Sequence, residues 1–195
     1  MLATEETGYM TALDAAGNDL LAGEYGWIEP NGEGGYLALK VDEAYDPDGS
    51  QLYPVVAINA QGEETETGVF SDVWSHGWYA EGLCRVQNSQ NSISYYLDAA
   101  GREAFRISED YADDFQGGHL ICVDSNSRYR LLNSDGSDAL GKAYASISYD
   151  SSLGDEARFI LIDDRGAIDV RNPITLESEL TIAPCGTTAW SAAQS

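Results

Sequence analysis

The sequence predicts an all-β protein built from a repeated β-hairpin. Three observations support this class. A short turn phrase occurs five times, each copy lies between short apolar or alternating runs, and few segments carry apolar residues at helical spacing. The phrase reads apolar, Asp or Asn, two variable residues, then Gly. Its copies occupy residues 13–17, 58–62, 97–101, 132–136 and 162–166.

The chemistry of this phrase predicts a tight turn. Asp or Asn at the start of a turn accepts hydrogen bonds from the backbone just ahead, and Gly three residues later adopts the left-handed conformation that other residues resist. A short apolar or alternating run, such as residues 93–97, precedes each copy, and a second run, such as residues 102–107, follows it. Strand, tight turn and strand together make a β-hairpin.

A second recurring phrase leads into the hairpins. It reads aromatic, spacer, Glu or Gly, Gly, then an apolar strand, with copies at residues 79–86 and 115–123 and a partial copy at 34–39. Hinges rich in Asn and Ser, at residues 88–92 and 125–127, separate the strands that follow.

The two phrases divide a single all-β domain into about five irregular antiparallel hairpin units. We expect the units to stack into a curved array or to close partly into a barrel. One helical turn is expected around residues 108–114. The units lie at residues 8–34, 35–76, 77–114, 115–148 and 149–182, followed by a C-terminal tail at 183–195.

This order of elements resembles the bacterial WG-repeat (KWG) family, whose unit joins a Gly-Leu strand, a polar turn and an Ile-Asp-x-x-Gly turn. Residues 82–86 with 96–103 carry the resemblance best, and residues 120–123 with 131–136 carry it next best. It covers about residues 77–140. The positions of the namesake Trp-Gly pair are held by Ser94-Tyr95 and Tyr129-Arg130. The resemblance implies a repeat architecture and a role in interaction more than in chemistry.

The charge balance excludes several classes of partner. The 195 residues include 33 acidic and 10 basic ones, for a formal net charge of −23. A phosphate backbone or an anionic membrane surface requires Lys and Arg, so neither is an expected partner. A strongly acidic surface favours solubility of a β-rich protein, and the alternative is attraction for cations or for a basic partner.

The sequence carries few signals of where the protein is located. No stretch approaches the roughly 20 apolar residues of a membrane span. Residues 1–6 lack a basic region followed by an apolar run, so a signal peptide is not expected there. An extracellular or cell-surface location is favoured over a cytoplasmic one.

No catalytic residue is expected. The two histidines, His76 and His119, lie in no nucleophile–base context, and His119 is expected to start a strand. Carboxylates are so abundant that a pair at glycosidase distance has no diagnostic value; candidates are Glu81, Asp98, Asp110 and Asp113.

The three cysteines, Cys84, Cys122 and Cys185, fit neither a disulfide framework nor a zinc pattern. We expect buried or half-buried free thiols. Aligning residues 84–86 with 121–123 predicts that Cys84 and Cys122 face different sides of their strands.

No cofactor is expected, and only one weak candidate for a metal-binding site is present. Asp46, Asp48 and Ser50 place oxygens at alternate positions, but the segment lacks the glycine and glutamate spacing of an EF-hand loop. The favoured interpretation is a Pro-Asp-Gly turn between strands, and a weak cation site is the alternative.

An aromatic cluster at Trp74, Trp78 and Tyr79 is the candidate binding site. Buried, these side chains would form the core between adjacent units, and this interpretation is favoured because repeat units need large apolar residues to pack. Exposed, they would stack on a sugar ring or anchor a protein partner.

We therefore expect a non-catalytic repeat module that presents a binding or scaffolding surface, with a protein partner at a bacterial cell surface. The alternative is a carbohydrate-binding or carbohydrate-active domain that uses Trp74 and Trp78.

Overall fold

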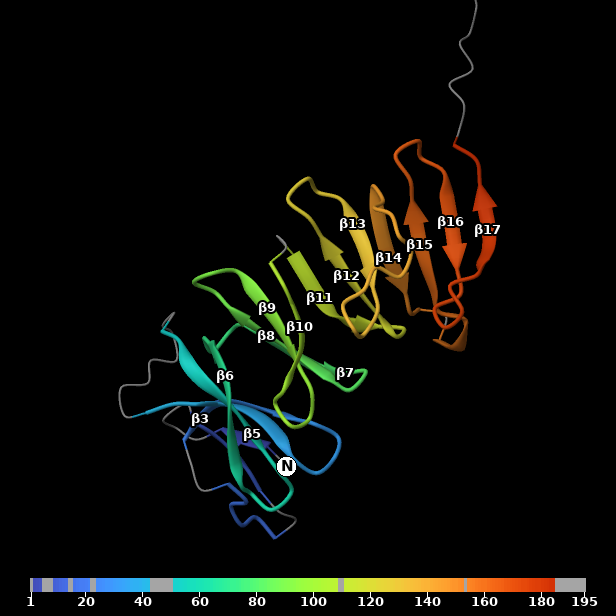
Figure 1. Ribbon diagram of the computed structural model, residues 1–195. Helices are drawn as coiled ribbons and strands as arrows, with labels where there is room; N and C mark the ends of the chain where they lie inside the picture. Colours follow the sequence, from blue (N-terminus) through green and yellow to red (C-terminus); the bar gives the residue numbers. More distant parts are fainter. Residues whose placement is uncertain are drawn as a thin grey trace, which may run out of the picture.

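The computed structural model is an all-β protein whose strands form four antiparallel sheets stacked one after another along the chain (Figure 1). It describes residues 2–4, 9–13, 16–21, 24–42, 51–108, 111–152 and 154–184. The predicted fold class, stacked antiparallel hairpin repeats, is confirmed. The one helical element in the described part of the chain is the 3-10 turn η1 (Gly154–Glu156), and no described helix is long and apolar enough to cross a membrane.

Within each sheet, strands that are consecutive in sequence pair with one another. The first sheet contains β1 (Leu2–Thr4), β2 (Met10–Ala12), β3 (Tyr25–Pro30), β4 (Tyr36–Lys40), β5 (Tyr53–Ile58) and β6 (Glu64–Ser71). The second contains β7 (His76–Ala80), β8 (Leu83–Asn88), β9 (Ile93–Leu97) and β10 (Glu103–Ile107). The third contains β11 (Tyr111–Gln116), β12 (His119–Val123) and β13 (Tyr129–Leu132). The fourth contains β14 (Ser146–Asp150), β15 (Arg158–Ile162), β16 (Ile168–Arg171) and β17 (Ser178–Ile182).

The sheets form an open array. Each sheet of described strands runs from one edge strand to another, so none of them closes into a barrel. The first sheet takes in strands from the predicted units 8–34 and 35–76. The division into five units stays a prediction.

Alternate side chains of each inner strand pack against different sheets, which is the geometry that stacking requires. In β8, Cys84 and Val86 lie in a core shared with the first sheet, whereas Leu83 lies in a core shared with the third. In β12, Leu120 faces the second sheet and Ile121 faces the fourth. Two rows of apolar residues per strand therefore hold the array together.

The repeated phrase forms the predicted turn. Its glycines, at positions 17, 62, 101, 136 and 166, all have φ between 75° and 85°. In the third copy, Asp98 Oδ1 accepts hydrogen bonds from the N–H groups of Ala100 at 2.9 Å and Arg102 at 3.0 Å. The same pattern occurs at Asn59 and Asp163. Asp14 of the first copy lies outside the described residues.

The same turn occurs at two further places whose sequences do not match the repeated phrase. Between β12 and β13, Asp124 Oδ1 accepts from the N–H groups two and four residues ahead, and Ser127 takes the glycine position with a φ of 58°. Between β3 and β4, Asn31 does the same, with Gly34 at 85°. The Asn31 side chain also donates to the Ala99 carbonyl at 3.2 Å, which ties the first sheet to the turn of the second.

The second phrase is also a turn. Glu81 and Gly82, at φ of 52° and 78°, join β7 to β8 as a two-residue connection. Gly117 and Gly118, at 57° and 83°, join β11 to β12 in the same way. Two consecutive residues with positive φ match the strand twist of a hairpin.

Two local expectations are wrong. The helical turn around residues 108–114 is not formed where the chain is described, because residues 111–116 make the strand β11. Cys84 and Cys122 are free and buried, as predicted, but both point toward the preceding sheet. The glycine turns determine the register here, so Cys122 is equivalent to Val86, two residues after Cys84. Cys185 lies outside the described residues.

The turn glycines differ in what surrounds them, and this predicts different sensitivities. Gly166 has open space around it, so Gly166→Ala should lower the free energy of unfolding by about 1 kcal/mol, through positive φ alone. A Cβ at Gly136 would lie 2.9 Å from the Phe105 ring, so Gly136→Ala should cost more, by about 1–3 kcal/mol of overpacking. Chemical denaturation measures both values.

Asparagine separates the two causes, because it tolerates positive φ but carries a Cβ. Gly166→Asn should be milder than Gly166→Ala, whereas Gly136→Asn should give no relief over Gly136→Ala. Equal losses for the two alanine variants would contradict this account.

Candidate functional site

The two candidate tryptophans are exposed, so the favoured interpretation that they form the core is wrong. Trp74 is 72% exposed and Trp78 is 73% exposed. Trp74 lies in the turn before β7, where its N–H donates to Asp72 Oδ1 at 2.9 Å. The core position between the first two sheets is held by Trp27, whose ring stacks on His76 with a centroid separation of 4.5 Å.

Tyr79 does not belong to the same surface. Its side chain is half-buried against the core of the first two sheets, and its hydroxyl donates to the Gly82 carbonyl at 2.8 Å. Burial, together with the nearby charges of Asp98 and Glu33, raises the pKa of Tyr79 to about 12. The structure therefore brings Trp74 and Trp78 to the surface and uses Tyr79 to anchor strand β7.

Carboxylates from two other sheets hold strand β7, which is an edge strand of the second sheet. Glu29 of β3 accepts the Tyr79 N–H at 3.0 Å, and Asp114 of β11 accepts the Trp78 N–H at 3.2 Å. Arg85 Nε forms an ion pair with Asp114 Oδ1 at 3.3 Å. These bonds satisfy an edge that would otherwise be open to strand pairing, and they fix the backbone that carries Trp78.

Position 77 has to be glycine for this arrangement. A Cβ there would overlap the Asp114 carboxylate.

Burial raises the pKa of Glu29, which is only 8% exposed, while the hydrogen bond from the Tyr79 N–H lowers it.

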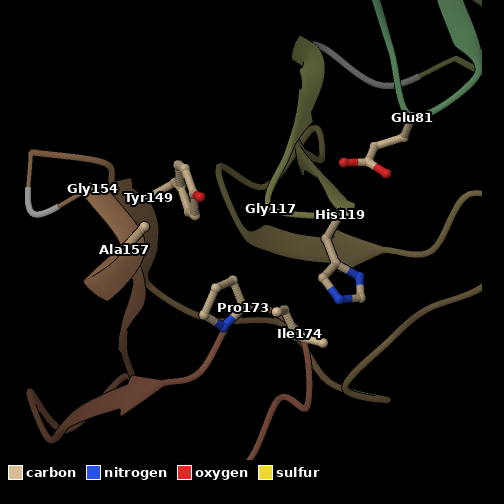
Figure 2. Close-up of a pocket in the computed structure, with 9 residues that line it drawn as sticks. Glu81, Gly117, His119, Tyr149, Gly154, Ala157, Pro173 and Ile174 are labelled. Atoms are coloured by element: carbon tan, nitrogen blue, oxygen red, sulfur yellow. The ribbon is translucent and has the colours of Figure 1, made fainter.

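A groove that the sequence did not indicate lies where turns of three sheets meet. It has a volume of about 720 Å³ and is lined by the β7–β8 turn, the β11–β12 turn and the end of the fourth sheet. Figure 2 shows Glu81 and His119 on one side and Tyr149 on the other, with Pro173 between them. The β11–β12 turn can approach the Tyr149 ring because position 117 is glycine; a Cβ there would lie 2.7 Å from the ring.

The groove combines polar side chains with an apolar rim. None of the described residues that line it is a Ser, Thr, Cys or Lys. Its polar groups are the Glu81 carboxylate, the Tyr149 hydroxyl and the His119 imidazole, and Ile174, which is 88% exposed, forms its rim.

Both histidines are the first residues of strands and pack against aromatic rings. His119 lies with its ring 5.8 Å from that of Phe159, and the Nδ1 atoms of His76 and His119 are buried without a hydrogen-bond partner. Burial lowers the pKa of both, more than nearby carboxylates such as Asp114 and Glu81 raise it. Burial therefore favours the uncharged form of both imidazoles relative to a histidine in water.

The described residues contain no group of three or more His, Cys, Asp or Glu that could hold a metal ion. The weak candidate set, Asp46, Asp48 and Ser50, lies outside the described residues, as does Asp110. The remaining candidate carboxylates lie at separate places. Asp98 accepts the bonds of a turn, Asp113 accepts from the Asp114 N–H and the Gln116 side chain, and Glu81 lines the groove.

No family model matches the chain, and no curated protein matches its sequence. Among solved structures it is similar to BamB from Moraxella catarrhalis, with a TM-score of 0.44 and 10% identity over 93% of this chain and 69% of that chain. It is also similar to residues 644–1017 of HIRA, with a TM-score of 0.40 and 11% identity over 77% of this chain and 52% of that one. Both scores lie below 0.5, and nothing about a partner or an activity follows from them.

The carboxylate that anchors β7 can be tested by substitution. Glu29→Leu leaves the Tyr79 N–H without an acceptor and should lower the free energy of unfolding by about 1–3 kcal/mol. Glu29→Gln keeps an acceptor oxygen and removes a buried charge, so its stability should stay close to wild type. Glu66→Leu, at an exposed position of β6, is the matched control. Equal effects of the two Glu29 variants in urea denaturation would argue against the anchoring role.

The histidines predict a pH dependence. Their folded-state pKa values lie below the unfolded value of about 6.5, so the unfolded chain binds more protons and stability falls as pH drops below that value. We expect the free energy of unfolding to decrease between about pH 7.5 and 5.5. His76→Phe, which keeps the stacking on Trp27, should reduce this decrease. An unchanged slope in the variant would mean that His76 titrates normally.

Proposed function

We propose that the chain is a non-catalytic binding module for a protein partner, located at a bacterial cell surface. The observation that carries the proposal is the exposure of Trp74 and Trp78, at 72% and 73%. The backbone at Trp78 and Tyr79 is held by carboxylates of two other sheets, and the Trp74 N–H is held by Asp72. A fixed, exposed indole loses little freedom on binding and buries a large apolar area, which is why tryptophan dominates binding hot spots.

The charges define the partner further. Within the described residues, eight of the ten Lys and Arg side chains form ion pairs with carboxylates of this chain: Lys40–Glu64, Arg85–Asp114, Arg102–Asp98, Arg106–Glu103, Arg128–Asp164, Arg130–Asp138, Arg158–Glu179 and Arg171–Asp169. The excess carboxylates leave an acidic surface. A partner with apolar pockets surrounded by basic side chains fits it best, and association should slow as salt is added.

A glycan is the second candidate ligand. Exposed indoles stack on sugar rings, and this mode needs no charge on the ligand. Binding to a neutral polysaccharide would be insensitive to salt, which distinguishes it from binding to a basic protein.

Membership of the WG-repeat family is also part of the proposal. Its support is the structural equivalence of the matched segments: β8 and β12 each follow a two-residue turn with positive φ, and Gly101 and Gly136 each donate to the carbonyl three residues back in the same backbone turn. The family resemblance is also the support for a bacterial cell-surface location.

The binding surface is tested with Trp74→Ala/Trp78→Ala and the matched control Phe70→Ala, which removes another aromatic that is 48% exposed. The wild-type chain, the double variant and the control are immobilised and exposed to a cell-surface extract of the source organism and to a polysaccharide panel. We expect a specific protein retained by wild type and control, and retention at least tenfold lower in the double variant.

Retention of a polysaccharide with the same dependence on Trp74 and Trp78 would favour the glycan alternative. Equal retention by all three proteins would mean that these tryptophans are not the binding surface. The absence of catalysis is tested on a panel of glycans and esters, where turnover abolished by one Asp, Glu or Ser substitution would make the chain an enzyme.

A further inference from the structure

The groove where turns of the second, third and fourth sheets meet combines one carboxylate with aromatic and apolar walls. Figure 2 shows the Glu81 carboxylate and the Tyr149 hydroxyl on opposite sides, each turned toward the space between them, with Pro173 and Ile174 along a third side. Its volume of about 720 Å³ is in the range of pockets that hold a ligand. Among the described lining residues, Glu81 is the one carboxylate and none is Lys or Arg, so the groove favours a cation.

The Glu81 carboxylate has no counter-ion in the described part of the chain. It takes part in none of the eight ion pairs and accepts no hydrogen bond there. The backbone holds Glu81 at a φ of 52°, whereas Gly117, at 57°, has the equivalent position in the turn of the next sheet. A residue with a Cβ is disfavoured at positive φ, so the fold presents a carboxylate to the groove where glycine would make an easier turn.

The other walls of the groove offer an aromatic ring, a hydroxyl and an aliphatic surface. Tyr149 is half-buried, and its hydroxyl makes no hydrogen bond to another described residue. Ile174 lies at the tip of a turn, where its N–H donates to Asn172 Oδ1 at 2.9 Å. This hydrogen-bonded turn keeps the exposed Ile174 side chain beside Pro173, so the apolar side of the groove exists before any ligand binds.

We propose that this groove binds an arginine side chain of the protein partner. A guanidinium is a planar cation with several N–H donors, which suit the Glu81 carboxylate and the hydroxyl and ring of Tyr149. The aliphatic stem of arginine suits Pro173 and Ile174. A lysine ammonium is a strongly hydrated point charge without a flat face, so it fits an aromatic wall less well.

The groove adjoins the exposed tryptophan of β7. Trp78 lies in this strand and Glu81 in the turn that follows it, so about 10 Å of extended backbone separates the two residues. One segment of a partner can therefore contact both. The inference rests on the proposed function, which supplies the protein partner, and it adds a defined basic residue to the chemistry of that partner. The net charge of −23 attracts such a residue toward the groove.

An NMR titration of the full 195-residue chain with the tripeptide acetyl-Gly-Arg-Gly-amide tests the groove directly. At low salt, the methyl signals of Ile174 and the ring signals of Tyr149 should shift with a dissociation constant on the order of a millimolar. The methyl signals of Leu180, at an exposed position of β17, should not shift. The same peptide with citrulline, which keeps the shape of arginine without its charge, should bind at least tenfold more weakly, and the lysine peptide at least threefold more weakly.

A charge-removing variant gives a second readout. Glu81→Gln keeps the size of the side chain and should weaken binding of the arginine peptide at least fivefold. Glu66→Gln, at an exposed position of β6, is the matched control and should bind like wild type. Shifts confined to residues outside the groove would overturn the proposal. So would equal or tighter binding of the citrulline or lysine peptide, or wild-type affinity in Glu81→Gln.

The failure of this inference can be told apart from failure of the proposed function. Trp74→Ala/Trp78→Ala leaves the groove residues in place and should bind the arginine peptide like wild type. If the peptide binds in the groove but the tryptophans retain no protein, the proposed function fails and the arginine site stands. If the tryptophans retain a protein but the peptide leaves the Ile174 signals unmoved, the groove inference alone fails.

Discussion

The whole structure depends on burying both faces of each inner sheet. A sheet in the middle of the array packs one row of side chains on the sheet before it and the alternate row on the sheet after it. Strand β8 shows this with Cys84 and Val86 on one side and Leu83 on the other. Both rows must therefore be apolar, and the strands read as short continuous apolar runs instead of clean alternation. In the turns, Asx side chains satisfy the backbone.

Strand β7 joins three sheets through two carboxylates. Glu29 comes from the first sheet and Asp114 from the third, and each accepts an N–H from the edge of the second. The exposed Trp78 thus rests on a strand whose position is determined by its neighbours on both sides. The groove around His119 forms one layer further along, where turns of the second, third and fourth sheets lie side by side.

The features that are local in sequence could be predicted, and those that depend on stacking could not. The turns at Asn59, Asp98 and Asp163 follow from the chemistry of Asx and Gly within five residues. The exposure of Trp74 depends on which tryptophan fills the core between two sheets, and Trp27, far away in sequence, takes that place. The orientation of Cys122 depends on a register fixed by Gly118, which a comparison anchored on leucines misplaces by one residue. The groove has no sequence signal, since its walls come from three separate sheets.

The pairing, within each sheet, of strands that are consecutive in sequence has a consequence for how the protein is made. Each hairpin can close as soon as its two strands and the turn between them have left the ribosome, because no strand waits for a partner from a later part of the chain. Of these four sheets, the first leaves the ribosome before the others and offers an apolar surface on which the second sheet can dock. Synthesis thus supplies the four layers in the order in which they stack.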